Sequence, residues 1–223
     1  MIEVFDDIVT EEEAQEIEDT MVNSWFPFYL GGGGKEYGTG TVGADVVHKH
    51  GEDPNVMDHF HFVHAVIHYD IDKQETSINS TADTMCVDLL NKLLRKLDKP
   101  NYSIYRCKVN LSPQHKRPPH TYNVPHVDMH RDHMVILYYV TDSDGPTYFF
   151  EDDGRTIIKK VEPKRGRFIF FDGNIKHAGS HPIKSKYRIV INYDIGFEDK
   201  TTLNITKSGL LESFLAGDGL DDR

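Results

Sequence analysis

Met134-Val-Ile-Leu-Tyr-Tyr-Val140 and Tyr187-Arg-Ile-Val-Ile-Asn-Tyr-Asp-Ile195 belong to a series of short apolar runs that decide the fold. Turn residues separate the runs, and each run is too short for a typical helix. The predicted strands cover residues 103–110, 134–140, 147–150, 156–161, 167–171 and 187–195. Short strands at such spacing are typical of a β-sandwich or barrel, which we expect in the second half of the chain.

The first hundred residues predict helices and strands that support this sheet. Residues 2–5 and 59–69 favour strands because they are short and apolar or β-branched. Thr10-Glu-Glu-Glu13 matches a capping box that opens a helix, and a second helix is expected from about Ala82 to a point before Pro100. The apolar faces of these helices are predicted to be Ala14, Ile17 and Met21, and then Cys86, Leu90, Leu93 and Leu97.

Three segments are interpreted as irregular. The glycine-rich residues 31–43 cannot sustain a helix or a central strand and lack the Gly-Lys-Ser/Thr pattern of a phosphate loop, so we expect a flexible loop there. Residues 112–122 precede the motif described below and form a second candidate loop. Each of the two can serve as a lid or as a substrate loop. The tail after Leu215, rich in Gly and Asp, is expected to be disordered.

Composition argues against several classes of protein. The formal net charge of −11 repels phosphate backbones and anionic lipid, so we expect neither a nucleic-acid partner nor membrane association. Residues 1–20 lack the apolar core of a signal peptide, and no apolar run approaches the length of a membrane span. The two cysteines, Cys86 and Cys107, are expected to be buried and reduced, which favours a cytoplasmic location.

Val124-Pro-His126-Val-Asp128 places an imidazole and a carboxylate two residues apart. Alternate residues of an extended chain share a face, so these two side chains can hold one metal ion. A third ligand would come from a distant strand, and His177 follows an apolar strand and a turn in Phe170-Phe-Asp-Gly-Asn-Ile-Lys-His177. Two histidines and one carboxylate on one face of an octahedron are typical of non-haem Fe(II) oxygenases.

Arg188 is the candidate for binding a co-substrate. A ferrous centre with one carboxylate ligand keeps a positive charge, which favours chelation by an anionic keto acid and leaves a position for O2. The far carboxylate of the keto acid needs a partner, ideally a bidentate guanidinium. Arg188 opens a strand eleven residues after His177, and Asn192 on the same strand face can add a neutral hydrogen bond.

These residues resemble the 2-oxoglutarate and Fe(II)-dependent oxygenase superfamily, and within it the prolyl-4-hydroxylase-like branch that includes small phage and marine bacterial versions. The resemblance covers about residues 101–196. It is carried by His126-Val-Asp128, Ile136-Leu-Tyr-Tyr139-Val, Asp144-Gly-Pro-Thr147, Pro163-Lys-Arg-Gly166, Phe170-Phe-Asp172, His177-Ala-Gly and Arg188-Ile-Val-Ile-Asn192.

The resemblance implies a double-stranded β-helix, or jelly roll, with flanking helices. It assigns the iron to His126, Asp128 and His177, and the 2-oxoglutarate carboxylate to Arg188 with Tyr139. The implied enzyme is a dioxygenase that hydroxylates a C–H bond with Fe(II), 2-oxoglutarate and O2, releases succinate and CO2, and uses ascorbate as an additional reductant. The implied substrate is peptidyl proline, a free amino acid or another small metabolite.

We therefore expect a single domain over residues 1–223. Within it, residues 1–100 form an α+β support region, 101–196 the jelly-roll catalytic core and 197–223 a C-terminal extension. Oligomeric state is not predicted.

Thirteen histidines make alternative ligands a concern. His181 is the nearest rival of His177, which we prefer because it follows an apolar strand and has the expected spacing to Arg188. His130 and His133 are expected to be solvent-exposed loop residues. His59 and His61 alternate on one strand face, and we expect them to pack or to lie at the surface rather than to form a second metal pair.

Two other functions stay open. Pro163-x-x-Gly166 followed by His177 resembles the second motif of cupins, although a cupin would have His-x-His with a downstream Glu where this chain has His126-Val-Asp128. The other alternative is a catalytically inactive jelly-roll binding module.

Overall fold

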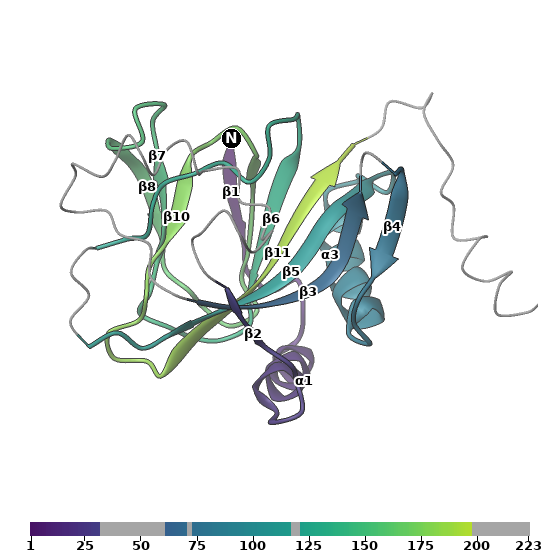
Figure 1. Cartoon of the computed structure of the whole chain (residues 1–223), viewed down its shortest axis with the longest axis horizontal. Helices are drawn as coiled ribbons and strands as arrows, with labels where there is room; N and C mark the ends of the chain where they lie inside the picture. The colour runs from purple at the N-terminus through teal and green to yellow at the C-terminus, as the bar shows by residue number, and fades with distance from the viewer. Residues whose placement is uncertain (32–60, 71–72, 117–120, 198–223) are drawn as a thin grey trace, which may run out of the picture.

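The computed structural model describes residues 1–31, 61–70, 73–116 and 121–197, which form two packed β-sheets and two helices (Figure 1). Of the loop expected at 31–43, Gly31 instead ends a strand, and residues 32–43 lie outside the described residues, as do His59 and the tail after Leu215. Within the described part of the chain, no helix combines the length and the apolar character needed to cross a membrane.

The larger sheet contains eight antiparallel strands in the order β1-β9-β6-β11-β5-β3-β2, with β4 added against β3. The strands are β1 Ile2–Phe5, β2 Tyr29–Gly31, β3 His61–Asp70, β4 Glu75–Ile78, β5 Ser103–Pro113, β6 Met134–Tyr139, β9 Phe168–Asp172 and β11 Tyr187–Gly196. β11 and β5 pair from Tyr187 opposite Pro113 to Gly196 opposite Ser103. This long pair of strands forms the centre of the sheet, and it carries most of the residues of the candidate site described below.

The smaller sheet has three antiparallel strands in the order β10-β7-β8, with bounds β10 His177–Gly179, β7 Thr147–Phe150 and β8 Ile157–Val161. It lies at the left of Figure 1, apart from the centre of the larger sheet. Phe149 and Val161 of the smaller sheet pack with Val135, Leu137 and Val190 of the larger one. The two sheets therefore enclose an apolar layer between them.

Both helices begin and end close to their predicted limits. α1 spans Glu11–Val22, and the capping box is present: the Thr10 hydroxyl accepts from the Glu13 amide at 3.2 Å, while the Glu13 carboxylate accepts from the Thr10 amide at 2.9 Å. α3 spans Asp83–Lys96, and the residue that follows it, Leu97, still donates its amide to Leu93. These helices cover the face of the larger sheet that points away from the smaller sheet.

The alternation of apolar side chains in β6 shows how one sheet supports two cores. Ile136 and Tyr138 point to the layer that contains α3, whereas Val135, Leu137 and Tyr139 point to the layer between the sheets. This is the two-residue period of a strand that is buried on both faces.

A substitution of Leu90 tests the packing of α3 against the larger sheet. It is completely buried on α3, so Leu90→Ala should leave a cavity and lower the free energy of unfolding by about 2–5 kcal/mol. Urea unfolding followed by circular dichroism measures the loss, with the exposed Asp88→Ala on the same helix as control. A Leu90 variant as stable as the control would contradict the proposed packing.

The expected strands are confirmed, with β5 extending to Pro113. Three further strands were not expected. β2 and β10 have three residues each, and β4 has four exposed residues, so none offers a clear sequence pattern. β2 and β10 take their extended conformation from pairing with β3 and β7, which are distant in sequence. β4 pairs with β3, which directly precedes it, and forms a hairpin with it. Ser112 and Pro113 thus belong to a strand rather than to the expected 112–122 loop, of which residues 117–120 lie outside the described part.

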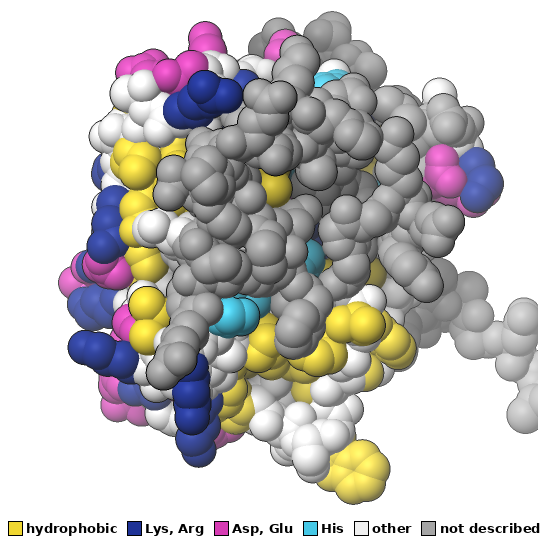
Figure 2. Space-filling model, turned by 60° about the vertical axis from the view of Figure 1, so that its left-hand side comes forward, with side chains coloured by type: hydrophobic (Ala, Val, Ile, Leu, Met, Phe, Trp, Pro, Cys, Tyr) yellow, Lys and Arg dark blue, Asp and Glu magenta, His cyan; other side chains and the backbone are white. Residues whose placement is uncertain are grey.

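Charges of both signs pair on the surface of the described region. Arg165 pairs with Glu11 and Glu18, and Arg167 pairs with Asp6. Figure 2 shows Lys and Arg side chains interspersed with Asp and Glu along the left-hand side of the view. Both cysteines are buried and free, as predicted.

Candidate active site

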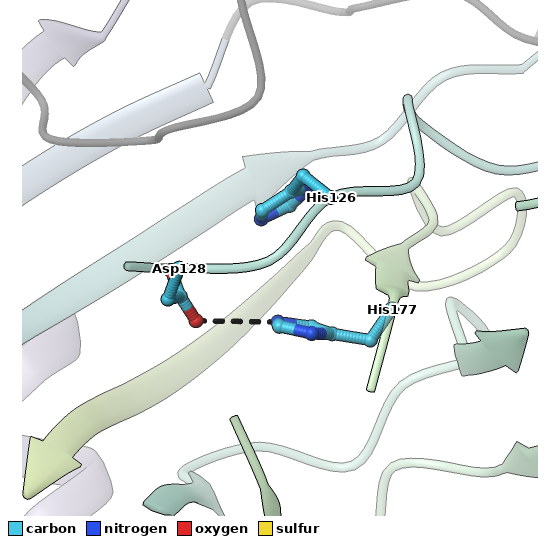
Figure 3. Close-up of side chains that lie close together, drawn as sticks. All are labelled: His126, Asp128 and His177. Carbon is cyan, nitrogen blue, oxygen red and sulfur yellow. Dashed lines mark ion pairs between the residues drawn. The ribbon is translucent and has the colours of Figure 1, made fainter. Parts of the chain in front are cut away.

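His126, Asp128 and His177 come together although they are far apart in sequence. Each offers one ligand atom, and the three atoms lie within 4.8 Å of one another. Figure 3 shows the side chains converging on a common space, with Nε2 of His177 3.3 Å from Oδ2 of Asp128. Among the described residues this is the one cluster of three or more His, Cys, Asp or Glu groups suited to a metal ion.

Backbone pairing places the two imidazoles side by side. His177 begins β10, and the loop residue His126 forms an isolated antiparallel bridge with it. The two peptide units exchange hydrogen bonds, with the His126 amide donating at 3.0 Å and the His177 amide at 2.9 Å. The ring centroids are consequently 4.9 Å apart. Asp128 lies two residues beyond the bridge, so its carboxylate shares the side on which His126 lies, as the His-x-Asp spacing predicts.

The Asp128 carboxylate is fully buried and strongly oriented. Oδ1 accepts from Nη2 of Arg106 at 2.5 Å, and Nζ of Lys108 lies 3.9 Å away from the same oxygen. Oδ2 accepts from the Asn192 amide at 3.2 Å and faces His177. Because Arg106 occupies Oδ1, Oδ2 is the oxygen best placed to bind a metal together with the two imidazoles.

The register of β5 and β11 explains this arrangement. Lys108 lies opposite Asn192, and Arg106 opposite Asp194, so the four side chains share the inner face of the sheet. Arg106 also donates from Nε to Oδ2 of Asp194 at 2.6 Å. The guanidinium therefore joins two buried carboxylates, which compensates the desolvation of all three groups.

Protonation states at pH 7 suit metal binding. Burial alone would raise the pKa of Asp128, but the charge of Arg106 and the hydrogen bond with His177 hold it well below the ordinary value. Burial and the neighbouring His177 lower the pKa of His126 to about 4, so this imidazole is neutral and can donate a lone pair. Burial and Arg106 lower the pKa of Lys108 to about 8, which leaves it mainly protonated.

Arg188 lies in a second, adjoining part of the site. Its Nη2 donates to the Thr147 hydroxyl at 2.8 Å, and that hydroxyl is 2.6 Å from the Tyr139 hydroxyl. The guanidinium is 5.4 Å from the centroid of the Tyr139 ring, and its buried Nε has no hydrogen-bond partner. A Cβ on residue 179 would lie only 3.2 Å from Nη1, so Gly179 leaves room for the guanidinium. No carboxylate of a described residue forms an ion pair with Arg188.

The site residues predicted from the sequence thus form two neighbouring groups. His126, Asp128 and His177 converge, and Arg188 and Tyr139 meet through Thr147. Asn192 shares the strand face of Arg188, but its amide donates to Asp128. In this structure Asn192 orients the carboxylate of the predicted metal ligand.

His133 corrects one expectation about the histidines. It was expected to be an exposed loop residue, yet only 5% of its surface is accessible. Its Nδ1 is 2.7 Å from the Arg131 carbonyl, and Nε2 lies 4.0 Å from Asp194. The turn after β9 buries it, because Gly173 donates its amide to the His133 carbonyl and lies against the ring. His130 is exposed, as expected, and His61 is half-buried.

His181 is also buried, but it does not join the metal-binding cluster. Its Nδ1 lies 2.9 Å from the Pro113 carbonyl, at the end of β5. The preference for His177 over His181 agrees with this geometry.

Arg106, Lys108 and Asp194 were missed by sequence reasoning. A signal was available: Arg106, Lys108 and Asn110 alternate with the apolar residues Cys107 and Val109 inside a predicted strand. Such alternation usually indicates a solvent-exposed strand face. Here that face is the wall of the site, a distinction that requires knowledge of the facing sheet.

No protein-family model and no curated protein matches the sequence. Solved structures do match the fold. The prolyl hydroxylase of Trichoplax adhaerens, solved with a peptide fragment of the hypoxia inducible factor oxygen degradation domain, has a TM-score of 0.57 and 12% identity over 88% of this chain and 83% of its own. The non-heme alpha ketoglutarate dependent epimerase SnoN from nogalamycin biosynthesis has a TM-score of 0.52 and 10% identity, over 87% and 77%.

These similarities confirm the expected jelly-roll fold. The chain therefore has the double-stranded β-helix architecture found in 2-oxoglutarate-dependent oxygenases. What the site does chemically rests on its own side chains.

Proposed function

We propose that the protein is a 2-oxoglutarate-dependent Fe(II) dioxygenase that hydroxylates a C–H bond. The observation that carries this proposal is that a possible metal site and a buried arginine without a carboxylate partner among the described residues lie close together. A His-Asp-His cluster with ligand atoms within 4.8 Å lies beside β11, and on β11 a buried arginine has no carboxylate partner among the described residues. The first feature suits a ferrous ion, and the second suits the far carboxylate of a keto acid.

The donor set fits iron. Two imidazoles and one carboxylate, all from one side, leave coordination positions for a bidentate co-substrate and O2. Iron and 2-oxoglutarate, when bound, would supply the oxidising chemistry, with succinate and CO2 as products. A cupin site would need a histidine where this chain has Asp128, so the cupin alternative is less well supported.

The residues of this chain would bind the metal and the co-substrate, orient them and exclude water from the site. Arg106 and Asn192 hold Asp128 so that one oxygen faces the imidazoles. Thr147 and Tyr139 orient the guanidinium of Arg188 toward the co-substrate carboxylate. Phe149 and Phe171, both almost completely buried, pack near the His177 ring and keep that side of the site apolar.

An anaerobic titration followed by a turnover assay tests the proposal. We expect 2-oxoglutarate to bind in the presence of Fe(II) and to bind much more weakly to the metal-free protein. On admission of O2, succinate should form with or without substrate, faster when a substrate is present. Binding of both ligands without succinate would contradict the dioxygenase activity, and absence of 2-oxoglutarate binding would favour the catalytically inactive binding module.

For the substrate we propose a small amino-acid-like molecule or a peptidyl residue. The Trichoplax enzyme was solved with a peptide fragment, which supports the peptide class by analogy alone. The buried, free thiols of Cys86 and Cys107 support a cytoplasmic location.

A further inference from the structure

The buried charges of the described chain are concentrated at one place. The Lys, Arg, Asp and Glu residues that are buried there are Arg106, Lys108, Arg188, Asp128 and Asp194. All five belong to the candidate site, and the cations outnumber the carboxylates by one. Ferrous iron and dianionic 2-oxoglutarate would cancel each other, so the loaded site would keep one positive charge with no buried counterion among the described residues.

Lys108 is the cation left without a close partner. Arg106 donates to both carboxylates, and Arg188 is the proposed anchor of the co-substrate. Nζ of Lys108 forms no hydrogen bond with a described residue. Its nearest carboxylate oxygen, Oδ1 of Asp128, is 3.9 Å away and already accepts from Arg106. A buried ammonium group in this state favours an additional anion.

The position of Lys108 on the sheet separates it from Arg188. Along β5 and β11, Lys108 is opposite Asn192, whereas Arg188 is opposite Ser112, four residues further along β5. On its other side, Lys108 is opposite the small residue Ala65 of β3, which is exposed. A bulge in β3 directly follows Ala65. The ammonium group therefore lies between the metal ligands and an accessible edge of the site.

We propose that Lys108 binds the carboxylate of the substrate, and that the substrate is a small free acid, such as an amino acid, rather than an internal residue of a peptide. The inference rests on the proposed function and specifies its substrate class. The acid group must lie close to the metal ligand Asp128, and hence within a few bonds of the carbon that reacts. A free α-carboxylate meets this condition, whereas an internal peptide residue has a neutral amide there.

Ligand binding under anaerobic conditions tests the proposal without turnover. The wild-type protein, loaded with Fe(II) and 2-oxoglutarate, is titrated by calorimetry with a panel of free L-amino acids and short monocarboxylic acids. Each acid that binds is compared with its carboxamide. We expect the carboxamide to bind about 10- to 100-fold more weakly, because it loses a charge-assisted hydrogen bond.

Lys108→Met should weaken binding of the acid by a similar factor and abolish the difference between acid and amide. Lys108→Arg should restore part of that difference. The affinity for 2-oxoglutarate, measured separately, should stay unchanged in both variants. The comparison of acid with amide on the wild-type protein holds even if a variant fails to fold.

Several results would overturn the inference. One is a wild-type protein that binds no acid of the panel, or that binds acid and amide equally well. Another is a Lys108→Met variant whose loss falls on 2-oxoglutarate, because Lys108 would then serve the co-substrate. Preferential binding of internal peptides with acidic side chains would also reject the small-acid class. Failure of the proposed function is distinct, because 2-oxoglutarate would then not bind the Fe(II)-loaded wild-type protein at all.

Discussion

Asp128→Ala is expected to abolish succinate formation and to weaken Fe(II) binding by more than about 100-fold, since loss of a group that merely supports a metal ligand already costs about 10- to 100-fold. Asp128 is fully buried and contributes the anionic ligand of the cluster. Its removal leaves a site of two imidazoles without an anionic ligand. Metal binding is measured by anaerobic calorimetry and turnover by succinate release.

The same substitution should also affect stability, because Arg106 and Lys108 lose a buried counterion. Removal of one member of a buried ion pair typically costs about 3–5 kcal/mol. Circular dichroism must therefore show that the variant is folded before its activity is interpreted. Asp132→Ala, on an exposed residue of the same loop, is the matched control and should bind iron normally. An Asp128→Ala protein with normal iron affinity would exclude the metal site.

Arg188→Met is expected to raise the Kd and KM for 2-oxoglutarate by about 30- to 5,000-fold, the range for removing one partner of a buried, hydrogen-bonded charge pair. The substitution keeps an apolar stem of similar length against Tyr139, while it removes the guanidinium that Thr147 orients. The rate at saturating 2-oxoglutarate should fall much less, because the metal ligands are unchanged.

A co-substrate analogue separates this role from a general disturbance of the site. 2-Oxopentanoate has the chain length of 2-oxoglutarate but lacks the far carboxylate, so the wild-type protein should bind it weakly. The Arg188→Met protein should bind the two keto acids almost equally. Arg95→Met, at an exposed position near the end of α3, serves as control. An Arg188 variant that still prefers 2-oxoglutarate strongly would assign the far carboxylate to another group.

Local signals in the sequence were sufficient for most of the elements. The capping box at Thr10, the helical spacing from Cys86 to Leu97 and the apolar runs of the larger strands all act over a few residues, so they are visible without tertiary information. The short strands β2 and β10 could not be predicted because pairing with distant strands imposes their extended conformation. β4 forms a hairpin with the neighbouring β3, but its four exposed residues carry no strand pattern.

The candidate metal ligands could be proposed from the sequence because metal binding demands particular residue types at restricted spacings, and the structure brings the three side chains together. His126 and Asp128 share a side as neighbours on an extended segment, and His177 could be selected by its distance to Arg188. The sequence by itself thus determined the longer strands, the helices and the candidate ligands.

Only the tertiary structure decided which other charged residues and histidines are buried around the candidate metal ligands. Arg106 and Lys108 alternate with apolar residues as an exposed strand face would, and His133 resembles any other loop histidine. Pairing of β5 with β11 turns that polar face inward, beneath Asp128, and the turn after β9 buries the His133 ring. Burial is a property of the facing layers rather than of the local chain, and burial is what converts these ordinary surface residues into charges that require a partner.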